Sequence, residues 1–355
     1  MTISFAEGAT EAILTGYMSD NAAGVAPQIV EAVAAAATGL VMPYGDDPLT
    51  QVMQTDFAQV FERDVDVFPV SSGTAANGLA LSALTPPWGG VVVHCGAHTN
   101  NDEAGGPEFF TGSAKLLAVD GADSKVDPDL LRARIALRKD DLHGVPPKVL
   151  SLTQITETGS VYSLDELKEL SDIAHEAGMR VHMDGARFAN ALVELNASPA
   201  EMSWKLGVDV LSFGATKNGT MTVDAVISFD PDLKMELSYR HKRSGQLSSK
   251  MRFQTAQLSA YLKDDFWLQN ARQANTMAER LREGLRKIPG AEILGSAPAN
   301  LFFCRLPQNI LNGLLDQGFG FYHGRWEPGV IRLVTSFAHT ERDVDAFLEA
   351  AQNIA

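Results

Sequence analysis

Short apolar runs alternate with longer amphipathic segments as far as about residue 260, and this alternation predicts strands separated by helices. Strands are expected at residues 65–70, 91–94, 148–154, 181–183, 208–213 and 225–229. Helices are expected at residues 27–37, 49–63, 75–84, 127–139 and 164–177. Such an alternation is typical of a largely parallel sheet that is covered by helices on both faces, so we expect an α/β fold.

The pattern changes in the last hundred or so residues. A long helix is expected at about 264–287, and further elements follow it: strands at 299–306 and 330–334, a helix at 309–317, and a last helix that begins at 340–343. This order predicts a small α+β domain. We therefore divide the chain into an N-terminal arm (1–18), a large domain (19–260) and a small C-terminal domain (261–355).

Two of the predicted strands end close to residues that can hold a cofactor. Asp184 ends one apolar run, and Lys217 follows the end of the next run 33 residues later. A lysine amine forms a Schiff base with a carbonyl, and pyridoxal 5'-phosphate (PLP) also needs a carboxylate against its ring nitrogen. Asp184 and Lys217 fit these two roles. The simpler alternatives are a turn-forming aspartate before Gly185 and a surface lysine before an Asn-Gly turn.

A third strand end predicts a phosphate site. The break Ser71-Ser-Gly73-Thr74 lies between the strand at 65–70 and the helix at 75–84. Free backbone N–H groups and the positive end of a helix dipole meet at such a junction, so we expect Gly73 and Thr74 to bind the cofactor phosphate. A plain strand-to-helix turn is the alternative, because neither the phosphate-loop string nor the GxGxxG string occurs here.

Composition narrows the class of partner. The net charge of −15 disfavours nucleic acid and anionic membranes, although one basic cluster lies at 239–245. Cys95 and Cys304 lack the spacing of a metal clip or a disulfide framework, so we expect no metal and a reducing compartment, the cytoplasm. The N-terminus predicts neither a signal peptide nor a membrane span.

Four strings carry a family resemblance, and they occur in order along the chain: Tyr44-Gly-Asp-Asp-Pro48, Ser72-Gly-Thr-Ala-Ala-Asn77, His182-Met-Asp-Gly-Ala-Arg187 and Ser212-Phe-Gly-Ala-Thr-Lys-Asn-Gly219. Together they resemble the threonine aldolases, which are fold-type I PLP enzymes. The resemblance implies a mainly parallel seven-stranded sheet, and cleavage of an L-β-hydroxy-α-amino acid of the threonine, allo-threonine or phenylserine type to glycine and an aldehyde.

Two other hypotheses for the function remain open. A β-eliminating lyase or an aminotransferase would use the same lysine and acid on the same scaffold. A nucleotide-binding or metal-binding regulator would use the Gly73 turn and the His182/Asp184 pair without catalysis. No third metal ligand with suitable spacing accompanies His182, so it is better read as a supporting partner of Asp184.

The resemblance also implies roles for two histidines. The family's ring-stacking histidine lies five residues before a Glu-Ala-Gly-Gly string, and His98 stands at that distance from Glu103. His143, just before a strand, matches the histidine near the substrate hydroxyl, with a role in proton transfer or specificity. Loop histidines that bond backbone groups are the alternative for both.

The resemblance further implies a carboxylate site and an oligomer. Arg332 matches the arginine that binds the substrate carboxylate, while Ser19 and Arg187 match groups near it; a structural salt bridge is the alternative for Arg187. A homotetramer or homodimer with active sites between subunits is implied, with Tyr44 and the cluster 239–245 as candidate contacts. The chain departs from better-known members at 154–159, where it reads Gln-Ile-Thr-Glu-Thr-Gly instead of Glu-Asn-Thr.

Overall fold

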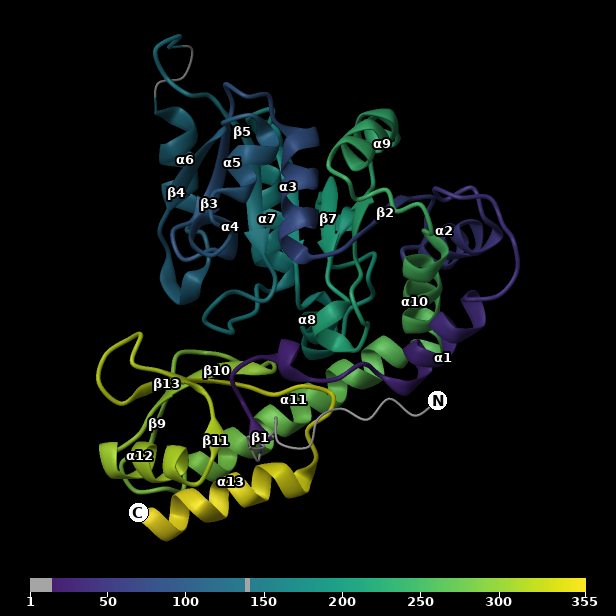
Figure 1. Ribbon diagram of the computed structural model, residues 1–355. Helices are drawn as coiled ribbons and strands as arrows, with labels where there is room; N and C mark the ends of the chain where they lie inside the picture. Colours follow the sequence, from purple (N-terminus) through teal and green to yellow (C-terminus); the bar gives the residue numbers. More distant parts are fainter. Residues whose placement is uncertain (1–14, 138–140) are drawn as a thin grey trace.

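The computed structural model describes residues 15–137 and 141–355, and its largest element is a seven-stranded sheet (Figure 1). The strands run in the spatial order β2, β8, β7, β6, β5, β3, β4, and β8 is antiparallel to both of its neighbours while the pairs from β7 to β4 are parallel. Their bounds are Asp66–Val70 (β2), Gly90–His94 (β3), Lys115–Val119 (β4), Pro147–Thr153 (β5), Arg180–Gly185 (β6), Val210–Phe213 (β7) and Asp224–Ser228 (β8). The predicted α/β architecture is confirmed.

Helices cover both faces of this sheet because each face buries its own apolar cluster. One cluster packs α3 and α9 onto the sheet, and the other packs α2, α7, α8 and α10 onto the opposite face. The helices of this part are α1 (Pro27–Ala36), α2 (Pro48–Val60), α3 (Gly73–Leu84), α4 (His98–Asn101), α5 (Gly106–Thr111), α6 (Pro128–Ala136), α7 (Leu164–Glu176), α8 (Phe188–Leu195), α9 (Lys234–Arg243) and α10 (Arg252–Leu262).

The C-terminal part has a separate core around an antiparallel sheet in the order β12, β13, β10, β9. Its elements are α11 (Phe266–Leu285), β9 (Glu292–Leu294), β10 (Leu301–Arg305), α12 (Gln308–Asp316), β11 (Phe319–Gly320), β12 (Tyr322–His323), β13 (Val330–Val334) and α13 (Glu341–Ile354). The first half of α11 packs in the large core and the second half in the small core, so this helix joins the two parts (Figure 1). The predicted α+β character is confirmed.

The N-terminal segment belongs with the small sheet. Residues 1–14 of the expected arm lie outside the described part, but β1 (Thr15–Gly16) pairs in parallel with β11, and Tyr17 is fully buried in the small core. Within the described residues, 15–137 and 141–355, no helix is long and apolar enough to cross a membrane.

The sequence did not predict three of the short elements. The segment 97–106, between two predicted strands, contains α4 and the start of α5. The edge strand β4 was not predicted either, although Leu116–Val119 are apolar; in the structure only two of its five residues are buried. The capping boxes that open α7 at Ser163 and α13 at Thr340 are present.

Candidate active site

The carboxyl ends of β6 and β7 form the floor of a cavity of about 240 Å³ that both Asp184 and Lys217 line. Gly214 allows the chain to turn there, because a Cβ on this residue would lie 2.3 Å from the carbonyl oxygen of Ala186. Asp224 then holds the turn by accepting the N–H groups of Ala215 and Thr216, at 2.7 and 3.0 Å. Tight packing of the two strand ends thus brings the acid and the lysine to one cavity.

The amino end of α3 forms a second wall. Ser71, Ser72, Gly73 and Thr74 line the cavity there, and the Ser72 hydroxyl caps the helix by accepting the N–H of Ala75 at 3.2 Å. A Cβ on Gly73 would meet nothing within 4 Å, so the side of this turn is open. The first backbone N–H groups of a helix and its dipole are a suitable site for a phosphate.

Asp184 is buried and held by two donors. Its Oδ1 accepts the N–H of Ala186 at 3.1 Å, and its Oδ2 accepts Nδ2 of Asn77 at 3.0 Å. Asn77 ends the string Ser72–Asn77, one of the four that carry the family resemblance, but the sequence analysis assigned it no role. Its position one turn into α3 could have indicated a side chain that faces the sheet ends.

His98, the first residue of α4, also lines the cavity. Its Nδ1 lies 2.9 Å from Oε1 of Glu103, whose side chain is fully buried. The hydrogen bond to Glu103 raises the pKa of His98 above its usual range, and burial raises the pKa of Glu103. The sequence predicted His98 for this site and used Glu103 only as a marker of the motif.

Arg187 does not line the cavity. Its Nε and Nη2 donate to the two carboxylate oxygens of Asp20 at 2.7 and 2.9 Å, and both side chains are buried. Burial alone would raise the pKa of Asp20, but the Arg187 charge outweighs it and lowers that pKa. Asn300 of the small domain also donates to Asp20, at 3.1 Å. The structural salt bridge that the sequence analysis gave as the alternative role of Arg187 is therefore present.

Arg332 is a half-buried cation without a carboxylate partner in the described part of the chain. Its Nη2 donates to the Met18 carbonyl at 3.3 Å, its guanidinium lies 4.8 Å from the centre of the Tyr322 ring, and its Nε is buried without a hydrogen bond. Burial, and the nearby charge of Arg187, lower its pKa. A desolvated guanidinium of this kind is suited to bind an anion.

Ser19 lies between the residues that contact the two arginines, Met18 and Asp20. Its hydroxyl accepts the N–H of Asn21, which lines the cavity, at 3.2 Å. The three residues predicted for the substrate carboxylate therefore gather beside the cavity, although they come from three distant segments.

His143 is not brought to the cavity. It is exposed in the loop before β5, at the amino end of that strand, whereas the cavity lies at the carboxyl ends. Its predicted role stays a prediction. The sequence suggested His182 as a supporting partner of Asp184, but no hydrogen bond joins the two side chains. The ring nitrogens of His182 lie 2.8 Å from the Ser151 hydroxyl and 2.9 Å from the Ser212 hydroxyl, and burial lowers its pKa to about 4.

The segment where the chain departs from the family adds an acid to the cavity. Gln154 turns away and exchanges two hydrogen bonds with the backbone of Tyr162, both at 3.0 Å, while Glu157 lines the cavity. The charge of Glu157 acts on His98, Arg187 and Arg332. The sequence marked this segment as unusual but did not identify Glu157 as a residue of the site.

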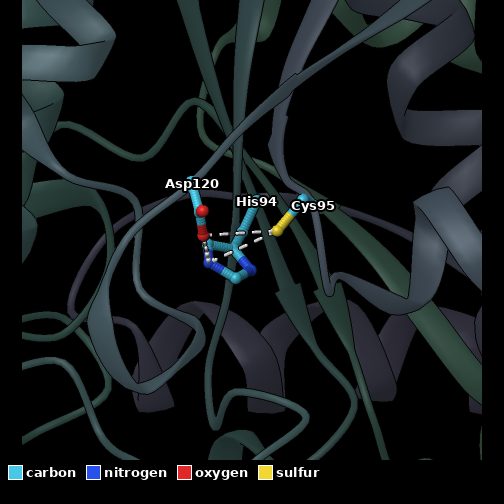
Figure 2. Close-up of side chains that lie close together, drawn as sticks. All are labelled: His94, Cys95 and Asp120. Carbon is cyan, nitrogen blue, oxygen red and sulfur yellow. Dashed lines mark hydrogen bonds and ion pairs between the residues drawn. The ribbon is translucent and has the colours of Figure 1, made fainter.

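Outside the cavity, His94, Cys95 and Asp120 come together at the ends of β3 and β4 (Figure 2). Their side-chain atoms lie within 4.8 Å of one another and include donors that suit Zn²⁺. However, Nδ1 of His94 accepts the N–H of Gly96 at 2.9 Å, and Nε2 lies 3.2 Å from the Gly121 carbonyl. With Nδ1 as an acceptor, Nε2 is the nitrogen that donates, and a metal would have to bind at this atom. We assign these contacts to hydrogen bonding.

A lysine, a buried carboxylate and a helix terminus at the carboxyl ends of sheet strands are the groups that PLP requires, so the residues fit this cofactor. The fold is that of the fold-type I enzymes: aspartate aminotransferase of Thermus thermophilus superposes with a TM-score of 0.69 at 17% identity, over 100% of both chains. This likeness identifies the fold alone.

Residues 17–304 match the model of the beta-eliminating lyase family, and the chain belongs to that family. It is 42% identical to a low specificity L-threonine aldolase of Pseudomonas aeruginosa over 95% of this chain and 96% of the relative. The structure of a threonine aldolase of Leishmania major superposes with a TM-score of 0.90 at 26% identity, covering 96% of this chain and 100% of that one.

Proposed function

We propose that the protein is a PLP-dependent lyase that cleaves L-β-hydroxy-α-amino acids, of the threonine type, to glycine and an aldehyde. The observation that carries this proposal is the shared cavity of Asp184 and Lys217 at the ends of adjacent parallel strands. The relatives named L-threonine aldolase support the reaction. When bound, PLP supplies the electron sink for the pair released at Cα.

Residues of the cavity would divide the work of holding the cofactor. Lys217 would bind PLP as a Schiff base, and the Asp184 carboxylate would keep the ring nitrogen protonated because an opposite charge in a buried site favours the charged form. The N–H groups of Gly73 and Thr74 would bind the phosphate. His98 would lie against the ring.

Arg332 would bind the substrate carboxylate, since it is the guanidinium near the cavity that has no acidic partner in residues 15–137 and 141–355. Arg187 would act beside it through Asp20, with the Ser19 turn between them. Fixing the carboxylate orients the bond to be broken relative to the ring. The proton of the β-hydroxyl needs an acceptor, and His98 and Glu157 line the cavity while His143 remains a candidate from the sequence.

An oligomer would explain the apolar surface of the loop between α1 and α2. Leu40 and Met42 are 103% and 64% exposed, and Tyr44 on the same loop is half exposed. Exposed apolar patches of this kind mark protein contacts. Lys242 of the basic cluster lies over the Tyr44 ring at 4.3 Å, so the two candidate contact segments are adjacent. We propose a homotetramer or homodimer, and we place it in the cytoplasm. Sedimentation of the wild type and of Met42→Asp would test the oligomeric state.

The reaction is tested by incubating purified, PLP-loaded protein with L-threonine. Aldol cleavage releases glycine and acetaldehyde in equal amounts. β-Elimination would give a 2-oxo acid with ammonia, and transamination would give a 2-oxo acid without ammonia. Lys217→Ala is the matched control: it should be inactive and should lose the yellow colour that borohydride bleaches in the wild type. A protein that stays colourless with PLP would contradict the proposal and favour a non-catalytic regulator.

A further inference from the structure

A chain of hydrogen bonds joins the histidine of the cavity wall to the acid at the cavity floor. Nδ1 of His98 lies 2.9 Å from Oε1 of Glu103, and the same oxygen accepts Nδ2 of Asn77 at 2.8 Å. Nδ2 of Asn77 also donates to Oδ2 of Asp184 at 3.0 Å. Glu103, Asn77 and Asp184 are buried, so water does not compete for these bonds.

We propose that Asn77 and Glu103 are positioning residues that tie His98 to Asp184 and hold the histidine ring in a fixed orientation at the cavity wall. The catalytic part of this inference rests on the proposed function, because it concerns the residues assigned to the cofactor ring. The two links use different chemistry, a carboxylate bound to the ring and an amide bound to two carboxylates.

Asn77 is well matched to its place. An amide NH₂ has two hydrogens, and each carboxylate receives one of them. Leucine has nearly the same shape but would remove the donor that lies between the two carboxylates, so that Oδ2 of Asp184 loses its hydrogen bond while Oε1 of Glu103 keeps only the bond to His98. Aspartate would add a third negative charge. Asn77 therefore joins two acids that would otherwise repel.

Glu103 controls the charge of His98. Three acids act on the His98 ring, namely Glu103, Asp184 and Glu157, and the hydrogen bond to Glu103 is the largest of these effects. Lys217 is the basic residue that lines the same cavity in the described part of the chain. A proton on Nδ1 of His98 offsets the charge of Glu103, the carboxylate that shares the Asn77 amide with Asp184. The tether also stops the ring from rotating.

The test is a titration of His98 in the PLP-loaded enzyme by NMR, with ¹³C-labelled histidine and with the signal assigned by its loss in His98→Asn. Glu103→Gln keeps the size of the side chain and removes its charge, so we expect the pKa of His98 to fall. Asp102→Asn is the matched control, because Asp102 is the adjacent residue and is exposed. It should leave the pKa of His98 in place.

Activity supplies a second readout. Each variant loses a hydrogen bond to a charged buried group, so we expect kcat of Glu103→Gln and of Asn77→Leu to fall about 10- to 100-fold with little change in KM. Glu103→Asp keeps the charge and should restore part of the His98 pKa. Asp102→Asn should keep wild-type kcat.

One result overturns the inference whatever the activity shows: a His98 that titrates at the same pH in Glu103→Gln as in the wild type. Circular dichroism of each variant separates this outcome from misfolding, and Asn77→Leu probes the other link if Glu103→Gln fails to fold. A kcat unchanged in Asn77→Leu would also overturn it. If the wild type cleaves no β-hydroxy amino acid, the proposed function fails, but the NMR titration still tests the tether.

Discussion

The two ends of the site are built in different ways. At the ring end, formed by Asp184, Lys217 and His98, the acid has a hydrogen-bonded partner on α3 and the histidine has one in the turn between α4 and α5. At the arginine end, formed by Ser19, Arg187 and Arg332, the groups come from the N-terminal segment, the end of β6 and the small sheet. The arginine end also depends on contact between the two parts of the molecule.

The difference fits what each end would bind. A cofactor that stays bound is best met by groups that are already oriented, and the partners of Asp184 and His98 orient them. A substrate that comes and goes needs a charge that is not already neutralised, and Arg332 is such a charge. Arg187, by contrast, is neutralised by Asp20 and acts as support.

The largest effect is expected at the ring end. Asp184→Asn keeps the size of the side chain but removes the charge that would hold the ring nitrogen protonated. Loss of one preorganised electrostatic contact costs about 10²- to 10³-fold, and we expect about 10³-fold in kcat for threonine cleavage because the ring charge serves the chemical step. A loss of less than tenfold would argue against a ring nitrogen at Asp184.

Breaking the support of the arginine end should cost stability. Asp20→Asn leaves the buried charge of Arg187 uncompensated, so we expect the free energy of unfolding in denaturant to fall by about 3 kcal/mol or more. Glu327→Gln is the control, because it removes an exposed partner of Arg305 and should cost less than about 1 kcal/mol. Equal losses in the two variants would show that the Asp20 pair is not structural.

The same contrast explains what the sequence could predict. Asp184, Lys217 and Gly73 follow strand ends within short strings, so local pattern and strand direction were enough to bring them together. The Asp20–Arg187 pair joins residues 167 positions apart, and only the packed structure determines it. The edge strand β4 is only five residues long and has two buried residues, so its short apolar run gave no period that separates a strand from a loop.

Arg332, the cation that would bind the substrate carboxylate, should have a smaller effect, and one that falls on substrate binding. Arg332→Gln removes a charge-assisted bond to the substrate carboxylate, so we expect kcat/KM for threonine to fall about 10- to 100-fold, mainly through KM. Arg325→Gln is the control, because Arg325 also lies over the Tyr322 ring but is exposed. It should stay within about twofold. Glycine binding should weaken in parallel in Arg332→Gln alone, and a change confined to kcat would contradict this role.

The smallest expected effect is a pH dependence of the free energy of unfolding, and it should differ between the ring end and the arginine end. Burial depresses the pKa of His182, beneath the ring end, to about 4, whereas the unfolded chain takes up this proton near pH 6.5. The stability that neutral His182 contributes is therefore complete above pH 6.5 and is lost as pH falls towards 4, by about 2 kcal/mol at pH 5.

The arginine end should not respond in this window. The pKa of Asp20 is held below 3.8, so its ion pair contributes stability above that pH and loses it only in stronger acid. The measurement is the free energy of unfolding at pH 7 and pH 5, at one protein concentration, for the wild type, His182→Gln and Asp20→Asn. His182→Gln should lose less between the two pH values than the wild type, and Asp20→Asn should lose the same amount. If the free energy of unfolding falls by the same amount between pH 7 and pH 5 in His182→Gln as in the wild type, other groups carry the pH dependence.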